Sequence, residues 1–177
     1  MSNNRYTPRD IVGQRFCIPL YQRLFAWTSK EVRKLLTDLK EHFDSERFQK
    51  EHNAYYLGML TVIVREGGDI DLIDGQQRFT VMILMAIAFK HIPEWNSFLE
   101  EGKRLKLVAR SEDENYLMSL SNDDNLTDHL NIGISYYGYE NLYMKNALLC
   151  ITDYIEKEFA GDEKARDSYA LNIYNHL

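Results

Sequence analysis

The clearest periodic pattern in the chain lies between residues 28 and 43. Thr28 and Glu31 have the spacing of a capping box, which marks the start of a helix. Apolar side chains follow at the spacing of one helical face: Val32, Leu35, Leu36, Leu39 and Phe43. The pattern predicts an amphipathic helix that packs one face on a core.

Two neighbouring segments have the composition of strands joined by a turn. Tyr55 to Val64 is rich in aromatic, leucine and β-branched residues, Gly67 and Gly68 supply a turn, and Ile70 to Ile73 resumes the apolar pattern. We therefore predict a β-hairpin or a closely related strand pair. Shorter apolar segments predict further strands at Arg15 to Pro19 and Leu105 to Val108.

The period of the pattern changes after Gly75. Phe79 to Phe89 is apolar nearly all round, which is typical of a helix buried in the middle of a domain, and we expect Pro93 to help end it. A capping-box spacing at Ser111 predicts another short helix, and residues 139–159 predict a long amphipathic one.

These elements together predict an α/β (α+β) fold with a small mixed sheet and surrounding helices. At 177 residues the chain is long enough for one domain with a core of its own. We expect that domain to span residues 1–120 and a helical extension, residues 121–177, to pack on it. Residues 121–135 are rich in Asn, Asp, Ser and Gly and predict a loop.

Charge limits the functions that the chain can have. The net charge of −6 argues against a surface that is basic all over, because phosphate contacts need Lys and Arg. The charge is unevenly distributed: residues 1–40 carry eight basic side chains against three acidic ones, and residues 151–177 carry three basic against six acidic. A positive N-terminal face is compatible with this distribution.

The cysteines and the apolar runs bear on location. Cys17 and Cys150 lie in apolar surroundings with no secretory signal before them, which indicates a reducing cytoplasm. The longest apolar run, Val81 to Phe89, is far shorter than the roughly 20 residues that a membrane span needs. We expect a cytoplasmic protein with no membrane role.

The segment that points to chemistry is the predicted strand-to-helix turn at Asp74-Gly75-Gln76-Gln77-Arg78. The first amides of a helix have no internal partners, and the helix dipole adds about half a positive charge there, so such a turn attracts anions. Gly75 allows close approach to the backbone, Gln76 and Gln77 add neutral donors, and Arg78 can bind phosphate through two parallel hydrogen bonds. Asp74 can cap the helix, hold Mg²⁺ or position a water.

A plainer interpretation treats Asp74 as the helix N-cap, Gly75 as a turn residue and the two glutamines as ordinary helix surface. It explains the Gln-Gln-Arg sequence poorly. Asp69 and Asp71 can also be metal ligands together with Asp74, but we favour solvated turn residues because Asp74 lies beyond the strand that carries the other two.

Three ordered motifs give the chain a family resemblance. They are Ile18-Pro19-Leu20-Tyr21-Gln22-Arg23 with Trp27 after it, Tyr56-Leu57-Gly58, and Leu72-Ile73-Asp74-Gly75-Gln76-Gln77-Arg78-Phe79-Thr80. In order and spacing they resemble the N-terminal domain of GmrSD-type modification-dependent restriction enzymes. The similarity continues through Arg104-Leu105-Lys106-Leu107 and covers most of the chain.

The resemblance implies a ParB/sulfiredoxin-like fold that binds and hydrolyses a nucleoside triphosphate, with Mg²⁺, in systems that restrict modified phage DNA. Carried over, Asp74 and Gln77 become catalytic candidates. Gly75, Gln76 and Arg78 become phosphate-binding residues, and the loop Tyr21-Gln22-Arg23 becomes the second wall of the site. Family members often continue into an HNH-type nuclease, and none is expected from this chain alone, so DNA is a partner either directly or through a nuclease domain or partner subunit.

Two questions stay open at this point. Tyr21 and Trp27 can be core aromatics with Arg23 a surface charge, or Arg23 can face phosphate while an aromatic ring stacks on a base. The function can be a nucleotide hydrolase that regulates DNA cleavage, a non-catalytic DNA-binding or DNA-sensing domain, or a plain interaction domain, and a homo-oligomer is possible in each case.

Overall fold

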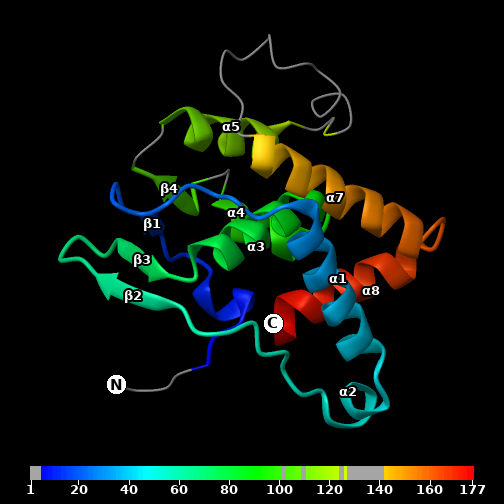
Figure 1. Cartoon of the computed structure of the whole chain (residues 1–177). Coiled ribbons are helices and arrows are strands. Elements are labelled where there is room, and N and C mark those ends of the chain that lie inside the picture. Colours follow the sequence, from blue (N-terminus) through cyan, green and yellow to red (C-terminus); the bar gives the residue numbers. More distant parts are fainter. Residues whose placement is uncertain (1–4, 101–102, 109–110, 124–125, 127–141) are drawn as a thin grey trace.

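A computed structural model describes residues 5–100, 103–108, 111–123, 126 and 142–177 (Figure 1). Within them a mixed sheet has the order β2-β3-β1-β4. Its strands are β1 (Phe16–Ile18), β2 (Thr61–Val64), β3 (Ile70–Asp74) and β4 (Leu105–Leu107). Strand β1 runs parallel to β3 and β4, whereas β2 runs antiparallel to β3. The predicted α/β class with a small mixed sheet is confirmed.

Helices make up most of the remaining described chain. They are the 3₁₀ helix η1 (Pro8–Ile11) and the α-helices α1 (Ser29–Asp44), α2 (Glu46–Glu51), α3 (Gln76–Ala88), α4 (Pro93–Leu99), α5 (Ser111–Asn122), α7 (Leu142–Glu158) and α8 (Glu163–His176). The sheet lies to the left in Figure 1, and α1, α7 and α8 lie to the right, with α3 between them. None of the described helices is long and apolar enough to cross a membrane.

Helix α3 is the centre of the core. Every side chain from Phe79 to Ile87 is buried, so the predicted all-round apolar helix is confirmed. The ring of Phe79 contacts Phe16 of β1, with 4.4 Å between centroids, which packs the helix against the sheet. Side chains from α1, α4, α7 and α8 join the same hydrophobic cluster. The core therefore includes residues on both sides of position 120, and the division into a domain and an extension stays a prediction.

Helix α1 begins as its sequence predicts. The Glu31 carboxylate accepts a hydrogen bond from the Thr28 amide at 2.8 Å, and Thr28 Oγ1 accepts one from the Lys30 amide at 3.2 Å, which completes the capping box. All five predicted apolar positions of α1 are buried. These five apolar side chains pack α1 against its neighbours in the core.

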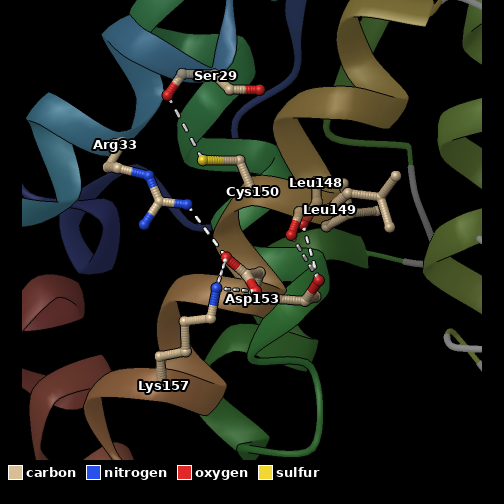
Figure 2. Close-up of polar contacts among 8 residues, drawn as sticks. Ser29, Arg33, Leu148, Leu149, Cys150, Asp153 and Lys157 are labelled. Carbon is tan, nitrogen blue, oxygen red and sulfur yellow. Dashed lines mark hydrogen bonds and ion pairs between the residues drawn. The ribbon is translucent and has the colours of Figure 1, made fainter.

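An ion pair joins α1 and α7 at the surface (Figure 2). Arg33 of α1 lies 3.1 Å from the Asp153 carboxylate of α7, which also binds Lys157 one turn later at 2.8 Å. Nearby, Cys150 Sγ points to the carbonyl of Ser29 at 3.5 Å. The Arg33 and Asp153 side chains are both more than 40% exposed, so the pair stabilises the protein little compared with the apolar contacts beneath it.

Three details differ from the sequence-based expectations. Pro93 begins α4 instead of ending the preceding helix. The first position of a helix tolerates proline because the amide there has no partner within the helix. The short helix α2 was not predicted, because Phe48 is its only buried residue. Residues 55–60 lie outside β2, so the strand predicted within Tyr55 to Val64 is shorter than expected. The loop predicted at 121–135 falls mostly outside the described residues.

Three histidines surround Phe48 where α2 meets the end of α8. The rings of His42, His52 and His176 have centroids 5.5, 5.6 and 5.2 Å from that of Phe48. His52 and His176 stack at 6.2 Å. Burial lowers the pKa of His176, and the neighbouring rings of His52 and His42 lower it further because a positive charge on them repels a second one. The folded protein therefore favours a neutral His176.

This pKa shift predicts that stability falls in mild acid. Since the pKa of His176 is lower in the folded than in the unfolded state, where it is about 6.5, the unfolded chain takes up the proton first as the pH falls below that value. We expect the melting temperature to decrease between pH 7 and pH 5, and to decrease less in His176→Gln. If the melting temperature decreased equally with pH in the wild type and in His176→Gln, this account would be wrong.

Candidate functional site

The strand-to-helix turn is made by Gly75. Its φ of +87° lies in the left-handed region, where a side chain is strained, and it forms the N-cap of α3. Asp74 is the last residue of β3, and its Oδ1 accepts a hydrogen bond from the Gly75 amide at 2.7 Å. The interpretation of Asp74 as the N-cap is therefore wrong, because the glycine takes that position and Asp74 lies one residue earlier, exposed to solvent.

Among the residues that the structure describes, no side chain caps the first turn of α3. The amide groups of Gln76, Gln77 and Arg78 come before the first backbone hydrogen bond of the helix, which runs from the Phe79 amide to the Gly75 carbonyl at 3.0 Å. These amides and the helix dipole therefore remain available to an anion.

The two glutamines of the turn hold the loop between β1 and α1. The Gln77 side chain accepts a hydrogen bond from the Ala26 amide at 2.7 Å and donates one to the Leu24 carbonyl at 2.9 Å. Gln76 donates to the Arg23 carbonyl at 3.4 Å. Both glutamine side chains are about 6% exposed. They thus fasten the loop to the start of α3, and the proposed catalytic role of Gln77 stays a prediction.

Gln22 connects the loop to the turn from the loop side. Its side-chain amide donates to the carbonyl of Ile73, near the end of β3, at 2.9 Å. The loop is therefore bound to the turn from both sides, by its own glutamine and by those of α3. The arrangement explains in physical terms why the two distant motifs occur together.

A pocket of about 460 Å³ lies between the loop and the turn. It is lined by Gln22, Arg23, Trp27, Ile73, Asp74, Gly75, Gln76, Gln77 and Arg78. The structure thus brings together every predicted site residue except Tyr21, which is 72% exposed and does not line the pocket.

Two arginines face this pocket from segments that are far apart in sequence. Arg23 comes from the loop and is exposed, whereas Arg78 comes from the first turn of α3 and is half-buried. Both residues line one pocket, which is where the resemblance places Arg78 and the loop that carries Arg23. Asp74 lines the same pocket.

Of the two aromatic residues in the loop motif, Trp27 is the one that lines the pocket. Unlike Tyr21, it is half-buried, with part of its side chain packed against the hydrophobic core. One ring therefore serves both as core and as pocket wall. A flat aromatic side chain in the lining of a pocket is the kind of surface on which a base can stack.

A metal site at Asp69, Asp71 and Asp74 was the less favoured interpretation of these carboxylates. Among the described residues no group of three or more His, Cys, Asp or Glu side chains lies close enough to hold a metal ion. Asp71 is 8% exposed and pairs with Arg65 at 2.8 Å. The expectation that Asp71 is a solvated turn residue is wrong, because its neighbours on the sheet bury it.

The segment before β2 also takes part in the site, through a contact that the sequence did not reveal. The Arg78 guanidinium donates to the carbonyl of Leu57 at 3.1 Å and to that of Met59 at 2.8 Å. The motif Tyr56-Leu57-Gly58 gave the signal that this segment matters, but its partner was not apparent from the pattern.

The fold and the pocket together define a mixed α/β domain whose candidate site lies where a sheet strand passes into the central helix. The chain belongs to a known family of such domains. It matches the family model for the GmrSD restriction endonuclease N-terminal domain over residues 7–177. No match was found among curated proteins or solved structures. The chain is thereby assigned to DNA restriction.

The hydrogen bonds of Gln77 predict a loss of stability on truncation. Gln77→Ala leaves the Leu24 carbonyl and the Ala26 amide without their side-chain partner, so we expect the free energy of unfolding to fall by about 1–3 kcal/mol. Urea titration measures the change, with Gln14→Ala at an exposed position as the control. An unfolding midpoint equal to that of the control would show that the clamp is unimportant.

Proposed function

We propose that the domain binds a nucleoside triphosphate in this pocket, with its phosphates at the start of α3. The observation that carries the proposal is that Arg23, Arg78 and the uncapped first turn of α3 line one pocket. Arginine can bind phosphate through two parallel hydrogen bonds, and the helix dipole adds attraction in the same place. Two guanidinium groups suit a ligand with several negative charges.

The size and the walls of the pocket support the same ligand class. Its volume of about 460 Å³ falls within the range of about 300–1,000 Å³ that is usual for small-molecule sites. In our proposal Trp27 receives the base, and the opposite end of the pocket receives the phosphates. Mg²⁺ would arrive with the triphosphate, as it usually does in proteins, since Mg²⁺ binds through substrate phosphates and one or two carboxylates.

For hydrolysis, Asp74 is the stronger of the two catalytic candidates. A carboxylate has about four lone-pair sites, so the hydrogen bond from the Gly75 amide leaves capacity for Mg²⁺ or an ordered water. Gln77 has both ends of its amide on the loop backbone. We assign it to orienting the loop, and through the loop Arg23.

The family gives this activity its setting. We propose that the domain is the nucleotide-dependent regulatory part of a cytoplasmic phage-defence protein that restricts modified DNA, with cleavage carried out by a nuclease domain or partner subunit. The ParB/sulfiredoxin likeness is part of the same proposal. The competing proposal is a non-catalytic DNA-binding or DNA-sensing domain in which the same arginines contact the phosphate backbone.

Arg23→Ala tests the phosphate site with little structural disturbance, because this side chain is exposed. Hydrogen bonds to charged groups contribute about 1.5–3 kcal/mol, so we expect the affinity for Mg-ATP or Mg-GTP to fall about 10- to 100-fold with an unchanged melting temperature. The control is Arg47→Ala, an exposed arginine of α2 that does not line the pocket. Equal affinities in both variants would refute the site.

Asp74→Ala separates binding from turnover. A carboxylate repels phosphate unless a metal ion lies between them, so its loss should spare affinity and reduce phosphate release. Calorimetric titration with nucleotide, followed by a phosphate-release assay, measures both quantities. Unchanged turnover per folded molecule would contradict the catalytic role. Binding of duplex DNA but no nucleotide would instead establish the competing proposal.

A further inference from the structure

The segment Leu57 to Leu60 crosses the start of α3 and then enters β2, and we call it the strap. It has no regular secondary structure. The Arg78 guanidinium binds the strap through the carbonyls of Leu57 and Met59, on either side of Gly58. A side chain that lines the pocket is therefore also the one that holds the strap.

Gly58 makes this contact possible. A Cβ atom at this position would lie 1.6 Å from Nη1 of Arg78 and 2.9 Å from its Cζ, so any side chain would displace the guanidinium. The φ of Gly58 is +116°, which L-residues also avoid. Sterics and backbone conformation therefore both require glycine where the strap passes Arg78.

A second glycine, Gly75, also lies against the strap. A Cβ atom at Gly75 would lie 2.3 Å from Cδ2 of Leu60 and 3.2 Å from the Met59 carbonyl oxygen. The glycine of the turn thus accommodates the strap, in addition to allowing the left-handed backbone. The expected role of Gly75 in the close approach of a ligand stays a prediction, and the contact with the strap is a second reason for a glycine here.

The strap orients Arg78 without neutralising it. A guanidinium has five N–H donors, and the two carbonyls engage one each on Nη1 and Nη2. Carbonyls carry no net charge, so the guanidinium keeps its positive charge, and the strap leaves three of its five donors for a ligand. A side chain held in one orientation loses less entropy when it binds.

We infer that the strap is a positioning element of the pocket and that Gly58 is a positioning residue, acting through Arg78. The inference rests on the proposed nucleotide site. Because one guanidinium serves both partners, a bound triphosphate and an ordered strap stabilise each other, and this coupling is reciprocal. The strap continues directly into β2, so nucleotide binding that orders the strap also stabilises this edge strand of the sheet.

A glycine pair in the chain gives a matched test. Gly68, in the turn between β2 and β3, also has a positive φ, +87°, but a Cβ there meets nothing within 4 Å. Gly58→Ala and Gly68→Ala therefore both introduce backbone strain, and only the first displaces Arg78. We expect Gly58→Ala to lose Mg-ATP affinity about tenfold or more, and Gly68→Ala to bind as the wild type does. Equal affinities in the two variants would overturn the inference.

A double-mutant cycle distinguishes this inference from the proposed function. If Gly58 acts through Arg78, Gly58→Ala should add no further loss of affinity to Arg78→Ala, and their effects on unfolding of the nucleotide-free protein should be non-additive. Additive effects in the nucleotide-free protein would refute the Gly58–Arg78 coupling. Non-additive unfolding effects with no nucleotide binding by the wild type would instead refute the proposed function, and the positioning role with it.

Hydrogen exchange of the wild type covers the case in which Gly58→Ala does not fold. Peptides that span residues 55–60 should exchange more slowly when Mg-ATP is bound, and those that span the turn at 66–69 should not change. In Arg78→Lys, which keeps the charge but lacks the planar fork, the protection of the strap should be lost. Strap exchange that ignores bound nucleotide in the wild type would overturn the inference.

Discussion

The left-handed turn at Gly75 is the constraint on which the rest of the site depends. It passes the chain from β3 directly into α3, and α3 is buried along most of its length, so the direction of its first turn is fixed by the whole core. The loop and the strap both attach to that first turn, through Gln77 and Arg78. The most deeply buried part of the core thus carries the residues that hold two segments without regular secondary structure.

A consequence is that folding and function share the same side chains. Gln22 and Gln77 bind backbone groups of the facing segment through their side-chain amides, and the pocket lies between the segments they join. Such a site is preorganised, because its walls are fixed before any ligand arrives. The loss of activity in a variant of this motif therefore has meaning only beside a measurement of its stability.

Local physical rules explain which parts the sequence predicted. The capping box and apolar face of α1, the all-round apolar α3 and the strands that flank Gly67-Gly68 depend on residues close to one another in the chain. The strap was wrongly predicted as strand because its carbonyls bond to the Arg78 side chain, some twenty residues later, instead of to a neighbouring strand. Likewise, the loop-holding hydrogen bonds of Gln77 join groups that no periodic pattern relates.

Strand β2 gives the domain an unusual boundary. It lies at one end of the sheet order, and Val62, Ile63 and Val64 are 41%, 55% and 68% exposed. An edge strand with apolar side chains and free backbone groups is a template for sheet extension by another chain, a hazard that proteins commonly reduce with charged residues or proline. The exposed apolar side chains of β2 therefore favour edge-to-edge association of two copies, a tendency that the net charge of −6 opposes by repulsion.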